Sequence, residues 1–212
     1  MTRPRILMAD DHSLVLAGLR RLIEEEGDVV GTVEDGRALL EEAQRLRPDI
    51  VFLDISMPLL NGLDAARQLK QLMPDSKLIF LTMHATPSYV TEAFKVGASG
   101  YLVKQSLAAE VKQAIQAVQQ GRYYMTPSVT NEVMGAISKG AVCKRPVTAL
   151  TSRQREVLQL IAEGKGTRAI AVILHVSVKT VEFHRARVMD ELDLHSTAEL
   201  TRYAISEGLV PL

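Results

Sequence analysis

Five short apolar runs recur along the first half of this sequence, and each is followed by residues with the spacing of an amphipathic helix. The runs expected to form strands cover about 5–9, 29–33, 50–54, 78–82 and 101–104. The helical spacing follows each run, over about 14–23, 37–46, 62–72, 87–96 and 107–119. Strands that alternate with helices form βαβ units, and such units build a parallel sheet. The pattern therefore predicts a doubly wound α/β domain with five parallel strands.

The third apolar run, Val51 to Leu53, ends in the carboxylate of Asp54. An uninterrupted apolar run is typical of a strand that is buried on both faces of a sheet. A charged last residue fits such a strand only where the strand emerges at the carboxyl edge, which is where open α/β sheets bind their ligands. Asp54 is therefore the candidate reactive group.

Two more carboxylates, Asp10 and Asp11, directly follow the first apolar run. In the strand order 2-1-3-4-5 the first and third strands are neighbours, so all three carboxylates are expected to meet at one edge of the sheet. Carboxylates held together raise one another's pKa unless a cation lies between them. A hard ion that prefers oxygen ligands resolves this conflict, so we predict a site for Mg²⁺ or another divalent cation.

Thr82 ends the fourth expected strand with a hydroxyl, and Lys104 ends the fifth with an ammonium. A metal ion, a hydroxyl and an ammonium around a carboxylate suit a transferred phosphoryl group, whose charge lies on its oxygens. Each residue alone has a simpler interpretation: Asp10 or Asp11 as a helix N-cap, Thr82 as a strand-end residue and Lys104 as a solvated tip. The combination indicates the phosphoryl site.

These segments resemble the receiver domain of two-component response regulators. The resemblance covers residues 5 to about 121 and is carried by the segments 8–12, 54–62, 81–85 and 100–104. It implies a flavodoxin-like (CheY-like) fold in which Asp54 accepts a phosphoryl group from a sensor histidine kinase. It also implies a protein that is not an enzyme in the usual sense, although it catalyses its own phosphorylation and dephosphorylation.

The same resemblance assigns roles to further residues. It implies that Mg²⁺ is held by Asp10, Asp11, Asp54 and the backbone carbonyl of Ser56. It implies that Lys104 pairs with the phosphoryl group, that Thr82 moves toward it and that Tyr101 changes rotamer. Ser56 and His84 occupy the positions that influence the lifetime of the phosphorylated state. Gln105 departs from the family, because many receivers carry proline after this lysine.

Composition sets outer limits on the class of protein. With 212 residues the chain is long enough for two modest domains, and its net charge of zero identifies no partner. The single Cys143 excludes an internal disulfide framework and suits a reducing compartment. No apolar stretch approaches the roughly 18 residues of a membrane span, and the N-terminus lacks the pattern of a signal peptide. We therefore expect a cytoplasmic protein without a membrane partner.

The last third of the sequence carries only helical spacing. A helix is expected from a cap at Thr151 or Ser152 to about Gly164, and another from a cap at Thr167 to Leu174. A turn precedes a longer helix over 178–192, and a fourth covers about 196–207. A short helix, a tight turn and a longer helix form a helix-turn-helix, whose second helix enters the major groove of DNA.

Charge alone leaves the long helix open to interpretation as an ordinary solvated face, because Glu182 offsets the nearby cations. The segments 150–158 and 170–184, however, resemble the LuxR-type DNA-binding domain, and the whole chain is similar to the NarL/FixJ class of regulators. The resemblance implies a recognition helix over 178–192 that binds double-stranded DNA. Its expected contact residues are Lys179, Thr180, Glu182, Phe183, His184, Arg185, Ala186 and Arg187.

The predicted organisation is a receiver domain over 1–124, a partly helical linker over 125–147 and a small all-α DNA-binding domain over 148–212. We expect phosphorylation of Asp54 to control transcription by releasing the DNA-binding domain from an inhibitory contact, by creating a homodimer, or by both. A dimer is favoured because one recognition helix covers only a half-site. Two alternatives remain. One is a flavodoxin-like enzyme or carrier, and the other is a DNA-binding regulator whose receiver makes protein contacts independently of phosphate.

Overall fold

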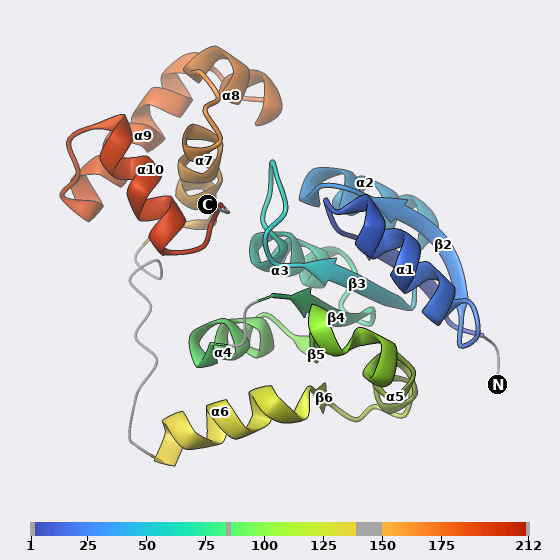
Figure 1. Cartoon of the computed structure of the whole chain (residues 1–212). Coiled ribbons are helices and arrows are strands. Elements are labelled where there is room, and N and C mark those ends of the chain that lie inside the picture. The colour runs from blue at the N-terminus through green and yellow to red at the C-terminus, as the bar shows by residue number, and fades with distance from the viewer. Residues whose placement is uncertain (1–2, 84–85, 139–149, 211–212) are drawn as a thin grey trace. The chain divides into compact units, whose positions relative to one another are not determined.

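The computed structural model describes residues 3–83, 86–138 and 150–210 (Figure 1). The predictions for His84 and Cys143 lie outside these residues. The chain forms two compact units, of which the first contains most of residues 1–144 and the second is built mainly from residues 145–212.

The first unit is built on a parallel sheet with the strand order β2-β1-β3-β4-β5-β6. Its strands are β1 (Arg5–Ala9), β2 (Asp28–Val33), β3 (Ile50–Asp54), β4 (Lys77–Thr82), β5 (Ala98–Val103) and β6 (Tyr124–Met125). The five predicted strands and their order are confirmed. The short strand β6, which the sequence pattern does not indicate, extends the sheet beyond β5.

Helices cover both faces of this sheet (Figure 1). They are α1 (Ser13–Ile23), α2 (Gly36–Leu46), α3 (Gly62–Leu72), α4 (Pro87–Lys95) and α5 (Leu107–Gln119), followed by α6 (Pro127–Ser138). On one face α1 and α5 pack together over alternate strand residues such as Met8 and Phe52, both fully buried. Helices α2 and α3 pack against each other on the other face. Successive strand residues point to opposite faces of the sheet, and helices cover both faces. Polar side chains therefore gather at the ends of the strands.

Two local predictions differ from the structure. The N-cap of α1 is His12, not Asp10 or Asp11, so both carboxylates remain in the loop that precedes the helix. The strand β5 begins at Ala98, three residues before the start that the apolar run over 101–104 predicts. Glycine at position 100 reflects close packing there, because a Cβ on Gly100 would lie 3.1 Å from the side chain of Ile79.

The second unit contains only helices among its described residues, 150–210. They are α7 (Ser152–Ala162), α8 (Thr167–Ile173), α9 (Val178–Leu192) and α10 (Thr197–Ser206). The predicted cap at Thr151 is confirmed, since Thr151 and Gln154 form a capping box. The predicted cap at Thr167 is wrong by one residue, because Gly166 holds that position. A core that includes Leu158, Val181 and Leu200 joins the helices.

Across the three described segments, no helix combines the length and the apolar composition that crossing a membrane requires.

Candidate functional site

The carboxyl edge of the sheet gathers the acidic residues that follow β1 and β3. Ala9 and Leu53 are paired in the sheet, so Asp10 and Asp54, the residues after them, leave the two neighbouring strands side by side. Ligand atoms of Asp10, Asp11, His12 and Asp54 all lie within 4.8 Å of one another. Asp10 and Asp54 are buried, whereas Asp11 is exposed. The structure thus brings the three predicted carboxylates together.

Lys104 reaches this cluster from the end of β5. Its Nζ lies 2.7 Å from Asp10 Oδ2 and 2.8 Å from Asp54 Oδ2, and its side chain is only 7% exposed. The residue begins the short 3₁₀ helix Lys104–Ser106, and this turn also contains Gln105. One ammonium therefore contacts two buried carboxylates, which offsets part of their mutual repulsion and of their desolvation cost.

Burial and charge act in opposition on this group of residues. Burial, the largest influence, raises the pKa of Asp54 although the ammonium of Lys104 lowers it. Burial lowers the pKa of Lys104, but the carboxylates of Asp54 and Asp10 outweigh burial, so the net shift is upward. Lys104 thus stays protonated at neutral pH. The ionised form of Asp54 is less stable than that of an exposed aspartate and gains from additional positive charge.

The remaining predicted residues lie at or near the same edge. Thr82 is the last residue of β4 and is fully buried, and it pairs with Val103, the neighbour of Lys104. Tyr101 is fully buried in β5, with its ring centroid 6.5 Å from that of Phe80. Ser56 follows β3 in the loop before α3 and is partly buried. The register of the sheet therefore explains why residues distant in sequence meet here.

Sequence reasoning gave no role to two residues that shape the site. His12 places its Nδ1 2.8 Å from Asp11 Oδ1 and 3.2 Å from Asp10 Oδ1. Gly62, which starts α3, donates its backbone N–H to the carbonyl of Ile55 at 2.8 Å. A Cβ at Gly62 would lie only 1.9 Å from the carbonyl oxygen of Asp54. Because His12 directly follows Asp10 and Asp11, the sequence could have indicated its place in the site. The close approach of Gly62 to the carbonyl of Asp54 could not be predicted in this way.

In the second unit, α8 and α9 form the predicted helix-turn-helix. The backbone N–H of Val176 donates to the carbonyl of Ala171 at 3.0 Å, and His175 adopts a left-handed conformation with φ of 53°. Ser177 caps α9 by accepting a hydrogen bond from the N–H of Thr180 at 3.1 Å. Together these contacts fix a tight turn between the two helices.

One face of α9 carries exposed residues three or four positions apart, namely Lys179, Glu182, Phe183, Ala186 and Arg187. Val181 and Val188 point into the core instead. The guanidinium carbon of Arg187 lies 5.6 Å from the ring centroid of Phe183, so the two side chains form a cation–π pair. This pairing orders a positive charge on a surface that is otherwise mixed in charge.

The other predicted contact residues of α9 are partly engaged within the protein. Arg185 donates to the hydroxyl of Thr197 at 2.8 Å, and the hydroxyl of Thr180 lies 2.9 Å from that of Ser177. His184 stacks edge-on against Phe183, with ring centroids 5.5 Å apart. Arg185, Thr180 and His184 thus contact neighbouring side chains and support the exposed stripe of α9.

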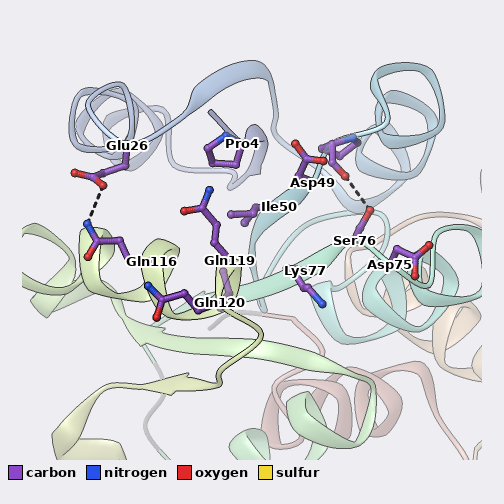
Figure 2. A pocket seen from close by; sticks show the side chains of 12 residues that line it. Pro4, Glu26, Asp49, Ile50, Asp75, Ser76, Lys77, Gln116, Gln119 and Gln120 are labelled. Atoms are coloured by element: carbon purple, nitrogen blue, oxygen red, sulfur yellow. Dashed lines mark hydrogen bonds between the residues drawn. The ribbon is translucent and has the colours of Figure 1, made fainter. Parts of the chain in front are cut away.

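A separate cavity of about 690 Å³ lies at the opposite, amino edge of the sheet (Figure 2). Ile50 and Lys77, at the starts of β3 and β4, line it together with Gln119 at the end of α5. Gln116 donates to the carboxylate of Glu26 across one wall at 3.2 Å. None of these residues was predicted to have a function, and the acidic cluster lies at the other edge.

Comparison with known proteins yields two family matches. The family model described as "Response regulator receiver domain" matches residues 6–116, and the one described as "Bacterial regulatory proteins, luxR family" matches residues 148–204. The chain therefore belongs to the response regulators that combine a receiver domain with a LuxR-type DNA-binding domain, the NarL/FixJ class. This assignment sets aside the flavodoxin-like alternative.

Individual relatives agree along nearly the full length. The chain is 34% identical to the transcriptional regulatory protein DegU of Brevibacillus brevis, covering 97% of this chain and 94% of the relative. It is 36% identical to the oxygen regulatory protein NreC of Staphylococcus epidermidis, covering 97% and 99%. Among solved structures, the RcsB response regulator of Salmonella typhimurium matches with a TM-score of 0.62 at 28% identity, covering 97% of this chain and 100% of the other.

One solved structure of RcsB is a complex with DNA, and it matches with a TM-score of 0.62 at 28% identity, covering 97% and 99% of the two chains. DegU is described as a transcriptional regulatory protein and RcsB as a two-component response regulator, and this chain matches each over 97% of its length. The protein is a response regulator with a receiver and a helix-turn-helix DNA-binding domain.

Proposed function

We propose that Asp54 is the phosphoacceptor of this response regulator and that a sensor histidine kinase is the donor. The observation that carries this assignment is the contact of Lys104 Nζ with both Asp54 and Asp10, at 2.8 and 2.7 Å. An ammonium fixed beside the reacting carboxylate is placed to pair with a phosphoryl oxygen. Thr82, buried at the end of the neighbouring strand, is the second donor toward that group.

The acidic cluster fits a hard divalent cation, Mg²⁺ above all. Its donor set is carboxylate oxygen from Asp10, Asp11 and Asp54, at mutual distances within 4.8 Å, and two of the three side chains are buried. We assign the backbone carbonyl of Ser56 as a further ligand. When bound, such a cation neutralises charge on the phosphoryl oxygens. The raised pKa of Asp54 supports this assignment, because added positive charge favours the ionised carboxylate.

In the transfer itself, an oxygen of Asp54 forms a bond to phosphorus while the bond from phosphorus to the kinase histidine nitrogen breaks. The nitrogen leaves with the electron pair, and Lys104 pairs with the transferred group. Hydrolysis later breaks the acyl phosphate, which releases inorganic phosphate and restores the carboxylate. Apart from the donor histidine of the kinase, the side chains for both steps belong to this chain, so it promotes its own phosphorylation and dephosphorylation. Tyr101 and Thr82 respond to the new group as switch residues.

The output is sequence-specific DNA binding through α9. The exposed stripe that contains Lys179, Phe183 and Arg187 faces the major groove, with Thr180, Glu182, His184, Arg185 and Ala186 completing the surface. Two copies bind as a homodimer, because one helix of this kind reads only a half-site. The division of labour is a receiver over 1–124, a linker over 125–147 and a DNA-binding domain over 148–212. A DNA partner supports the proposal that the protein acts in the cytoplasm.

The test is incubation of the protein with acetyl phosphate and Mg²⁺, with acyl phosphate detected on a phosphate-affinity gel. The wild type and the surface control Asp75→Ala are expected to be labelled, and Asp54→Ala is expected to remain unlabelled. Labelling that persists in the Asp54→Ala variant rules out Asp54 as the acceptor. DNA affinity that is equal with and without the donor would favour a receiver that serves only for protein contacts.

A further inference from the structure

Thr126 lies between β6 and α6 and is only 3% exposed. A buried hydroxyl needs hydrogen-bond partners, and Thr126 has them on two different elements. Its Oγ1 accepts from the backbone N–H of Val103 at 3.2 Å and donates to Glu110 Oε2 at 2.8 Å. Its own N–H donates to the carbonyl of Tyr101 at 3.0 Å. One side chain and one amide therefore tie the segment after β6 to both β5 and α5.

These contacts end one residue from the phosphoryl site. Val103 directly precedes Lys104, whose ammonium contacts Asp54 and Asp10. The path from Asp54 to Thr126 thus consists of an ion pair, one peptide unit and one hydrogen bond. A second contact of Thr126, from its N–H to the carbonyl of Tyr101, reaches the residue that is expected to change rotamer on phosphorylation.

Glu110 reinforces the contact from α5. Its carboxylate also accepts a hydrogen bond from the hydroxyl of Tyr124 at 3.3 Å. Burial and the charge of Glu110 both raise the pKa of Tyr124, in agreement with a carboxylate held close to that ring. The two-residue strand β6 is therefore fixed at both ends, by Tyr124 and by Thr126, although a strand this short has little stability of its own.

Thr126 is also the residue from which α6 starts. Its carbonyl accepts from the N–H of Thr130 at 3.1 Å, and Pro127 begins the helix (Figure 1). In the sequence, α6 is the last described element before residue 139, and the DNA-binding helices begin at Ser152. The hydrogen bond from Val103 therefore reaches the residue at which the helix preceding the DNA-binding domain starts.

We propose that Thr126 is a positioning residue that couples the phosphorylated state of Asp54 to α6 through Val103 and Glu110. Phosphorylation gives Lys104 a new partner, and the backbone at Val103 follows the lysine. The buried hydroxyl of Thr126 then weakens or exchanges its hydrogen bond to Val103, which gives the start of α6 two alternative arrangements. The coupling rests on the proposed role of Asp54, since without a phosphoryl group Lys104 has no reason to change partners.

The test compares Thr126→Val, which removes the hydroxyl at nearly constant shape, with Thr126→Ser, which keeps it. Thr130→Val is the matched control, because the hydroxyl of Thr130 donates within the first turn of α6, to the carbonyl of Thr126 at 3.3 Å. Each full-length variant is treated with acetyl phosphate and Mg²⁺. Acyl phosphate on Asp54, amide hydrogen exchange of peptides covering 101–104 and 127–138, and DNA affinity are measured. The DNA is a fragment selected from genomic DNA with the wild type.

The wild type is expected to change its DNA affinity at least about fivefold on phosphorylation, the lower end of typical coupling between sites. Thr126→Val should be phosphorylated like the wild type but show a change below about twofold, with exchange in 127–138 insensitive to phosphate. Thr126→Ser and Thr130→Val should keep the wild-type response. If Thr126→Val proves unfolded by circular dichroism, Glu110→Ala tests the same link from the α5 side with the same expected loss.

A Thr126→Val protein that keeps the full response in exchange and DNA affinity overturns the coupling and leaves the role of Asp54 intact. So does a Thr130→Val protein that loses the response equally, because the effect is then a general property of α6. A wild type that takes up no phosphate on Asp54 contradicts the proposed function itself, and the coupling with it.

Discussion

Lys104 Nζ lies 2.8 Å from Asp54 Oδ2, yet the pKa of Asp54 is raised because burial outweighs the ion pair. Protonated Asp54 is therefore favoured more in the folded than in the unfolded protein. Its contribution to stability is present below the usual pKa of 3.8 and is lost as the pH rises through the higher folded-state pKa. At neutral pH without a divalent cation, ionised Asp54 thus works against folding.

We accordingly expect Asp54→Asn to raise the unfolding midpoint of the receiver by a few degrees at pH 7 in EDTA. The gain should shrink as the pH falls toward 3.8, and it should be offset by Mg²⁺, which stabilises the wild type more than the variant. Differential scanning fluorimetry at several pH values, with exposed Asp75→Asn as the control, measures it. A variant that is less stable than the wild type at pH 7 in EDTA contradicts this account of Asp54.

The linkage of Lys104 has the same sign as that of Asp54, because both pKa values are raised, but for Lys104 it is the charged form that the folded state stabilises. Burial lowers its pKa, but Asp54 and Asp10 raise it further, so the stability from these ion pairs is present below the usual pKa of 10.5 and is lost as the pH rises through the folded-state value. Lys104→Ala leaves two buried carboxylates without their cation, and we expect a loss of about 3 kcal/mol in the free energy of unfolding at pH 7. Added Mg²⁺ should restore part of it.

The matched control is Lys112→Ala. Lys112 pairs with Glu26 on the surface, with a side chain that is 61% exposed, so its loss should cost much less stability than the loss of Lys104. Urea unfolding in EDTA measures both variants. Equal losses for the two lysines would show that the Lys104 pairs are no stronger than a surface ion pair.

The sequence was sufficient for the five long strands, their order and the helices between them, because each is marked by several apolar residues in a regular period. It was also sufficient to bring the carboxylates and Lys104 to one edge, since that follows from strand order alone. Strand β6 was missed because two residues cannot display a period.

Contacts between polar residues far apart in the sequence could not be predicted. Arg67 joins Asp64 on its own helix to Glu92 on α4, at 2.7 and 3.1 Å, although Asp64 and Glu92 look like ordinary surface acids in the sequence. Their side chains are only 1% and 9% exposed. The burial and the hydrogen bonds of Thr126 could not be predicted for the same reason. Burial of such groups depends on which helices lie side by side, and local periodicity contains no information on the partners of a polar residue.

Gly62 gives a sharp prediction for the geometry of the site. A Cβ there would overlap the carbonyl oxygen of Asp54 at 1.9 Å, so Gly62→Ala must displace either β3 or α3. We expect a loss of roughly 2 kcal/mol or more in stability, as for other overpacked sites, together with slower labelling by acetyl phosphate.

Gly18→Ala is the control. Nothing lies within 4 Å of a Cβ at Gly18 in α1, so it should gain up to about 1 kcal/mol. Wild-type labelling and stability in Gly62→Ala would contradict this close approach.

The pair formed by Arg187 and Phe183 predicts how α9 contributes to DNA binding. Both side chains are exposed, and the cation–π contact at 5.6 Å holds the guanidinium on the helix surface. If Arg187 reads a base, Arg187→Ala should weaken specific binding by about 1–3 kcal/mol and relax the preference at one position. If it binds a phosphate, the loss should be uniform across sequences and the salt slope should fall by about 1.

Phe183→Ala should give a smaller loss of the same kind, because the arginine remains but is no longer held in place. Fluorescence anisotropy at several salt concentrations separates these outcomes. Arg45→Ala, which removes an arginine from α2 of the receiver, is the control for net charge, and equal losses for Arg45→Ala and Arg187→Ala would remove α9 from consideration as the recognition helix.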